Sequence, residues 1–169
     1  MRWVIIIVGG LLALVALVAV IGVLLPQSHV ASRSRTFAQS AERVFGAISD
    51  VKGYPKWRPG VSEVSVLADQ PLRWREVGSN GTVDFQLAES QAPQRQVVVI
   101  ASPDLPFGGR WEYDVAADSG GARLTITERG EVYNPIFRFM ARFVFGYTKT
   151  MEDYLTALDT HLAGASKAP

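Results

Sequence analysis

The sequence has no cysteine among its 169 residues and only two histidines. The lack of cysteine excludes disulfide bonds, thiolate nucleophiles and cysteine-ligated zinc, and it is compatible with either side of a membrane. His29 and His161 are far apart in the sequence, and neither has a cluster of acidic residues beside it. We therefore expect no metal site and no other cofactor.

An excess of one charge and the common catalytic motifs are also missing. The 17 basic and 16 acidic residues leave a net charge of +1 with no block of like charges, so we expect no nucleic-acid partner. No serine occurs in a G-x-S-x-G pattern, and no glycine-rich phosphate loop leads from a strand into a helix. The familiar catalytic templates are therefore absent.

The chain does contain one unbroken apolar run, from Trp3 to Leu25. A helix of this length spans about 35 Å, which suffices to cross the roughly 30 Å hydrocarbon core of a bilayer. Pro26 has no amide hydrogen and is expected to end the helix. We predict a single-pass membrane anchor at residues 1–26, followed by a linker at residues 27–31.

Two other interpretations of the apolar run stay open. Arg2 ahead of an apolar stretch is also typical of a cleaved signal peptide, although the run exceeds the usual length of about 7–15 residues and His29-Val30-Ala31 is a poor cleavage site. A buried helix of a soluble protein seldom lacks a polar face over such a length. The side of the membrane is not determined, because basic residues flank both ends, at Arg2 and at Arg33, Arg35 and Arg43.

The rest of the chain is long enough for one domain, which we place at residues 32–163 with a flexible tail at residues 164–169. A first strand is expected at Ser32–Ala38, then a helix at Ala41–Ile48 capped by Ser40 and a short helical turn within residues 50–59. Six more strands are expected at Val61–Ala68, Leu72–Val77, Thr82–Glu89, Arg95–Ser102, Arg110–Ala117 and Ala122–Val132. The pattern predicts an α+β fold with an antiparallel sheet of about seven strands.

Alternation along the strands predicts one strongly apolar face of the sheet. Trp111, Tyr113 and Val115 share one side of their strand, while the residues between them are polar. In the last strand the same alternation places Glu128 on the apolar side. Glu128 is therefore the candidate for proton transfer, with Tyr113 as a second candidate that could orient a substrate.

A structural role for Glu128 is the alternative. Arg75 or Arg123 could pair with its carboxylate in a salt bridge.

A long C-terminal helix is expected from Pro135 to Leu162, with Asn134 as its N-cap. Its apolar residues recur at spacings of three and four and define one face, which comprises Ile136, Met140, Phe143, Tyr147, Met151, Tyr154, Leu158 and Leu162. Further apolar residues widen the first half of this helix beyond one face, namely Phe137, Phe139, Val144 and Phe145. We expect something other than the sheet to cover that end.

Two segments of the sequence resemble a known superfamily. They are the D-x-x-x-Y-P-x-W pattern (Asp50, Tyr54, Pro55, Trp57) and the G-E-x-x-N-P pattern (Gly130, Glu131, Asn134, Pro135). With the order of elements, they resemble the helix-grip fold of the START/polyketide cyclase-dehydrase superfamily, also called SRPBCC or birch-pollen-allergen-like. The resemblance implies a hydrophobic pocket between sheet and helix that receives lipids, sterols, quinones or aromatic polyketides.

The candidate ligand-binding residues follow from this architecture. They are Trp74, Phe85, Trp111, Tyr113, Ile126, Met140, Phe143 and Tyr147. Leu105 and Phe107 are apolar residues in the loop of residues 103–109, and we expect them to act as a gate. The alternative is that the aromatic residues only fill the core and that the loop packs its own side chains inward.

Three functional hypotheses follow. The first is a membrane-tethered carrier or sensor that binds a hydrophobic small molecule. The second is a cyclase or dehydratase acting on a polyketide or isoprenoid, which needs a polar group such as Glu128 inside the cavity. The third is a membrane accessory or assembly protein that binds a protein partner through the aromatic end of the last helix.

Overall fold

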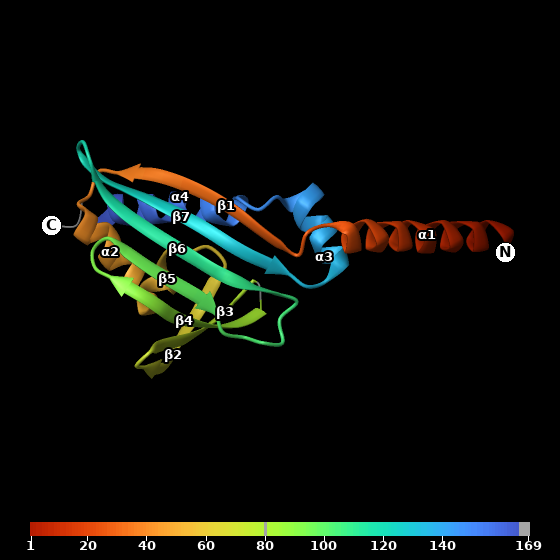
Figure 1. Cartoon of the computed structure of the whole chain (residues 1–169), viewed down its shortest axis with the longest axis horizontal. Coiled ribbons are helices and arrows are strands. Elements are labelled where there is room, and N and C mark those ends of the chain that lie inside the picture. Colours follow the sequence, from red (N-terminus) through yellow and green to blue (C-terminus); the bar gives the residue numbers. More distant parts are fainter. Residues whose placement is uncertain (80, 166–169) are drawn as a thin grey trace.

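The computed structural model describes residues 1–79 and 81–165. Its centre is one seven-stranded antiparallel sheet with the order β1-β7-β6-β5-β4-β3-β2. The strands are β1 (Ser28–Phe37), β2 (Val61–Asp69), β3 (Leu72–Gly78), β4 (Gly81–Gln91), β5 (Arg95–Ile100), β6 (Phe107–Asp118) and β7 (Gly121–Val132). The sheet curves around the last helix, which lies along its inner face (Figure 1).

The helical elements complete the expected helix-grip fold, which is confirmed. They are α1 (Arg2–Leu24), α2 (Ala41–Ser49), the 3₁₀ helix η1 (Val51–Lys56), α3 (Pro135–Met140), the π-helical turn η2 (Ala141–Phe145) and α4 (Lys149–Ala165). Ser40 caps α2 as expected, because its side chain accepts a hydrogen bond from the Arg43 amide.

The core lies between the inner face of the sheet and the helices α2 and α4. The predicted alternation holds: Tyr113, Val115, Leu124 and Ile126 are buried on this face. In the pairing of β6 with β7, Tyr113 lies opposite Ile126, and Trp111 lies opposite Glu128. Glu128 is therefore on the apolar side of the sheet, as the sequence predicted.

The first strand begins earlier than expected. Strand β1 starts at Ser28 and pairs with β7 from that residue onward, so most of the expected linker at residues 27–31 is part of the sheet. Only Leu25, Pro26 and Gln27 separate it from α1. At the other end of the chain, Gly164 and Ala165 still belong to α4, and residues 166–169 of the expected tail lie outside the described residues.

The C-terminal helix is interrupted, which the sequence analysis did not predict. Gly146 has a φ of +73°, which is a left-handed conformation that ends the π-helical turn, and α4 starts at Lys149. Met151, Tyr154, Leu158 and Leu162 pack into the core, while Ile136 and Phe143 are exposed. The expected single apolar face is therefore correct only for the part of the helix in α4.

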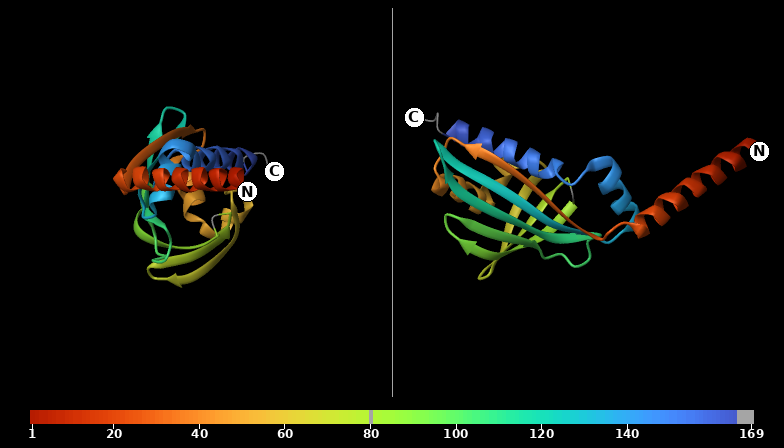
Figure 2. Two further views of the ribbon diagram at one scale, coloured as in Figure 1. Left: turned by 90° about the vertical axis from the view of Figure 1, so that its right-hand side faces the viewer. Right: turned by 45° about the horizontal axis from the view of Figure 1, so that its top comes forward.

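The apolar run forms one helix, α1, that projects away from the domain (Figure 2). It is long and apolar enough to cross a membrane, and a signal sequence would share these properties. The end of α1 packs against α3: Gly22 lies so close to Pro135 that a Cβ at this position would collide with the Pro135 carbonyl. Arg138 Nη1 also donates a hydrogen bond of 3.1 Å to the Leu25 carbonyl.

Candidate functional site

A cavity of about 330 Å³ lies between the inner face of the sheet and the start of α4. Five of the residues predicted to bind a ligand line it, which are Trp74, Phe85, Trp111, Tyr113 and Tyr147. The first four come from the central strands β3, β4 and β6, whose alternation directs large side chains inward. The cavity is therefore largely walled by aromatic rings.

Three of the predicted ligand-binding residues do not line this cavity. Ile126 is fully buried in the core on β7. Met140 and Phe143 belong to α3 and η2, which the break at Gly146 separates from α4. Of the predicted gate, Phe107 lines the cavity as the first residue of β6, and Leu105 does not.

Glu128 has two hydrogen-bond partners inside the cavity. Its Oε1 lies 2.9 Å from His29 Nε2, and its Oε2 accepts a hydrogen bond of 2.7 Å from Trp111 Nε1. The two arginines expected as salt-bridge partners of Glu128 pair elsewhere, Arg75 with Asp84 and Arg123 with Asp118. The sequence analysis also missed the acidic neighbour of His29, which strand pairing supplies from 99 residues away.

Two features hold His29 in place. Its ring stacks on Tyr147 with the ring centroids 3.8 Å apart, which joins β1 to the segment before α4. Gly130 lies opposite His29 on β7, and a Cβ there would collide with the imidazole. The pair of His29 and Glu128 is thus enclosed by β1, β7 and Tyr147, where a carboxylate and an imidazole can exchange a proton.

Arg58 is a second polar group that the sequence analysis missed. It follows η1, lines the main cavity and also lines a neighbouring cavity of about 270 Å³ beside the β3–β4 hairpin. Its Nη1 donates a 2.6 Å hydrogen bond to Glu76 Oε1, which also accepts a 2.9 Å hydrogen bond from Trp74 Nε1. No spacing in the sequence links Arg58 to Glu76, because the contact depends on tertiary packing of the segment after η1.

Tyr54 and Tyr113 line the main cavity, and Tyr154 lines the neighbouring one. Burial raises the pKa of Tyr54 to about 12, and it also raises the pKa of Tyr113 and of Tyr154 above the ordinary value for a phenol. All three phenols therefore stay protonated at neutral pH. Tyr54 donates its hydroxyl to the Ile48 carbonyl at 2.6 Å.

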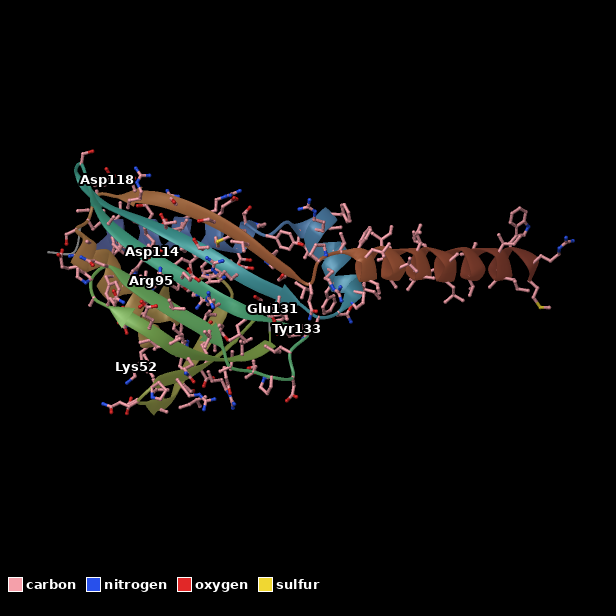
Figure 3. All side chains as sticks on the ribbon, in the orientation of Figure 1. Lys52, Arg95, Asp114, Asp118, Glu131 and Tyr133 are labelled. Carbon is pink, nitrogen blue, oxygen red and sulfur yellow. The ribbon has the colours of Figure 1, made fainter. Side chains whose placement is uncertain are left out.

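The end of the cavity nearest α1 is bounded by apolar residues. Phe107, Ala141 and Phe145 line it there, where β6 begins and η2 ends. Glu131 and Tyr133 lie at the same end of the molecule, beside α3 and α1 (Figure 3). The Tyr133 hydroxyl donates a hydrogen bond of 2.9 Å to Glu131 Oε2.

The sequence from Ser28 to residue 163 matches the family described as polyketide cyclase / dehydrase and lipid transport. The match covers nearly the whole domain. The chain belongs to this family. A comparison with curated proteins found no match.

Solved structures of the family's fold align over the same domain. A START superfamily protein from Mycobacterium smegmatis has 18% sequence identity and a TM-score of 0.67, with 81% of this chain and 99% of that chain covered. TTHA0849 from Thermus thermophilus has 21% identity and a TM-score of 0.67, covering 82% and 100%. The Zhui aromatase/cyclase from Streptomyces sp. R1128 has 13% identity and a TM-score of 0.67, covering 83% and 97%. At these identities the similarity shows the fold alone.

Proposed function

We propose that the protein is a membrane-anchored binding or transport protein for a hydrophobic small molecule. The observation that carries this proposal is the aromatic-lined cavity of about 330 Å³ between the sheet and α4. Its volume falls in the range of about 300–1,000 Å³ that is usual for small-molecule sites. Trp74, Phe85, Trp111, Tyr113 and Tyr147 would contact the ligand, and Phe107 would act as a gate.

The surface next to α1 supports a location at a bilayer. Apolar side chains that are 50–65% exposed gather on α3 and η2, namely Phe137, Phe143, Val144 and Phe145. α3 packs against the end of α1, and η2, which continues directly from α3, bounds the cavity (Figure 2). A bilayer crossed by α1 would cover them, which accounts for the wide apolar surface, and the cavity would then face the membrane.

Filling the cavity tests the proposal. In Val98→Phe the added ring occupies the cavity, because Val98 lines it on β5. We expect native mass spectrometry of the full chain, extracted gently from membranes, to detect a bound hydrophobic molecule. The amount bound to the variant should be at least about tenfold lower. Val30→Phe is the matched control, since Val30 is exposed on β1. An empty wild-type protein, or equal loading of Val98→Phe, would refute the proposal.

A cyclase or dehydratase activity is the second candidate. It is favoured by the His29–Glu128 pair, which places a possible proton donor and acceptor within a hydrophobic cavity. Glu128→Gln keeps an acceptor for Trp111 but cannot take a proton. We expect this variant to lose at least about a hundredfold of any turnover of a bound polyketide or isoprenoid while still binding it. Unchanged turnover in liquid chromatography assays of the products would exclude Glu128 from the chemistry.

A further inference from the structure

Arg58 is a charged side chain at the wall between the two cavities, and most of its donors are unused. Its side chain is 16% exposed, and that of its partner Glu76 is 8% exposed. A guanidinium has five N–H donors. Among the described residues, the one side-chain hydrogen bond of Arg58 goes to Glu76. Arg58 lines both cavities.

Aromatic rings cover the guanidinium without satisfying these donors. The Arg58 Cζ lies 5.0 Å from the ring centroid of Tyr54, 5.4 Å from that of Tyr154 and 5.9 Å from that of Phe85. These cation–π contacts hold the planar group in one orientation. A ligand in the cavity would therefore meet a guanidinium held in one orientation, whose side chain binds Glu76 alone among the described residues.

The charge balance decides which acceptor fits. Arg58 is already neutralised by Glu76, which lines the neighbouring cavity, and the carboxyl group of Glu128 lines the main cavity beside His29. Arg110 and Glu131 also line the cavity, but their side chains are bound elsewhere, to Glu112 and to the Tyr133 hydroxyl. A ligand carboxylate would bring a second negative charge next to Glu76 in a poorly solvated site, which is costly. An uncharged oxygen accepts the same hydrogen bonds without that cost.

We propose that Arg58 and Glu76 form a subsite for the carbonyl oxygen of an uncharged apolar ligand, such as a ketone, quinone or ester, and that they disfavour free carboxylic acids. This inference rests on the proposed ligand-binding function and specifies its ligand class. The apolar part of the ligand lies among Trp74, Phe85 and Trp111, and its carbonyl oxygen accepts hydrogen bonds from Arg58.

Three probes of equal chain length test the subsite: a long-chain methyl ketone, the alkane and the fatty acid. Binding to the full chain in lipid nanodiscs is measured by native mass spectrometry. We expect the ketone to bind at least about tenfold more tightly than the alkane or the acid, the gain typical of a hydrogen bond to a charged group. Arg58→Met combined with Glu76→Gln should remove the preference for the ketone and leave alkane binding unchanged.

A single substitution gives the sharper result. Glu76→Gln keeps an acceptor for Trp74 but leaves the Arg58 charge uncompensated, so we expect affinity for the fatty acid to rise at least about tenfold while ketone affinity stays within about threefold. A purely structural ion pair would not produce this reversal. Arg123→Met combined with Asp118→Asn removes an exposed ion pair on the sheet and is the matched control.

The outcomes separate the two proposals. If none of the three probes binds the wild-type protein, the proposed function itself is wrong. If all three bind equally, if the acid binds most tightly, or if Glu76→Gln gains no affinity for the acid, the subsite is wrong while binding of apolar ligands stands.

Discussion

At the scale of single residues, three carboxylates of the sheet have different surroundings. Glu76 is paired with Arg58 at the cavity wall, and Glu128 is held by His29 and Trp111 inside the cavity. Glu112 lies on the other face of β6, where Arg110 and Arg129 both donate to its Oε1, at 2.8 and 2.7 Å. Glu76 and Glu128 can contact a ligand, whereas Glu112 cannot. A substitution of Glu112 therefore measures what an ion pair of this kind contributes to the free energy of unfolding.

Stability should depend on pH through Glu112. The hydrogen bond from Arg110 lowers the pKa of Glu112 from 4.5 to about 2, with burial opposing and Arg129 adding to the shift. Because the folded pKa is depressed, the stabilisation is present above about pH 4.5 and is lost as the pH falls through about 2. We expect Glu112→Gln to lower the free energy of unfolding at pH 7 by about 1 kcal/mol after solvent screening.

The measurement is unfolding of the full chain in mild detergent, followed by circular dichroism between pH 7 and pH 2. The difference between wild type and Glu112→Gln should shrink steadily below pH 4.5. A difference that stays constant over this range would show that the Glu112 charge does not stabilise the fold. Arg95 belongs to the same network, because its Nη1 donates at 2.7 Å to Asp114 and its Nη2 at 3.4 Å to Glu112 (Figure 3).

At the scale of elements, the segment α3–η2 differs from the rest of the helical structure. Phe143 and Phe145 are 60% and 65% exposed, although they belong to a segment that also bounds the cavity. In the proposed membrane setting, these rings lie in the interface beside α1. The segment would then connect the bilayer to the cavity.

The lack of native cysteine allows a direct test of this placement. Phe143→Cys and Ser119→Cys each introduce one thiol, the first on η2 and the second in the exposed β6–β7 turn at the opposite end of the domain, next to Asp118 (Figure 3). In vesicles containing the full chain, we expect a fluorophore on residue 143 to be shielded from aqueous iodide at least about threefold more than one on residue 119. Equal quenching at the two positions would place η2 in water.

An element could be predicted from the sequence when its pattern is local, that is, when it involves residues close together in the chain. The strands were predictable because alternation such as Trp111, Tyr113 and Val115 is a local pattern of period two. The break at Gly146 was not, because apolar spacing of three and four continues across it and a glycine alone does not indicate a positive φ. His29 with Glu128, and Arg58 with Glu76, depend on tertiary packing that no local pattern encodes.

At the scale of the whole molecule, the family match covers the domain and does not include the first helix. The family match begins at Ser28, and α1 ends at Leu24. The two parts are nevertheless joined by more than the chain, since Gly22 packs on Pro135 and Arg138 binds the Leu25 carbonyl. The helix α1 and the segment α3–η2, which bounds the cavity, therefore form one structural unit.

The short passage from α1 to β1 limits what such a protein can do. Only Leu25, Pro26 and Gln27 lie between them, and β1 is an integral strand of the sheet, so the domain cannot swing away on a flexible tether. In the proposed setting the domain has one fixed orientation on one leaflet of the bilayer. The domain would exchange its ligand with that leaflet or with a protein that binds there. It could not carry a ligand through water to a distant membrane.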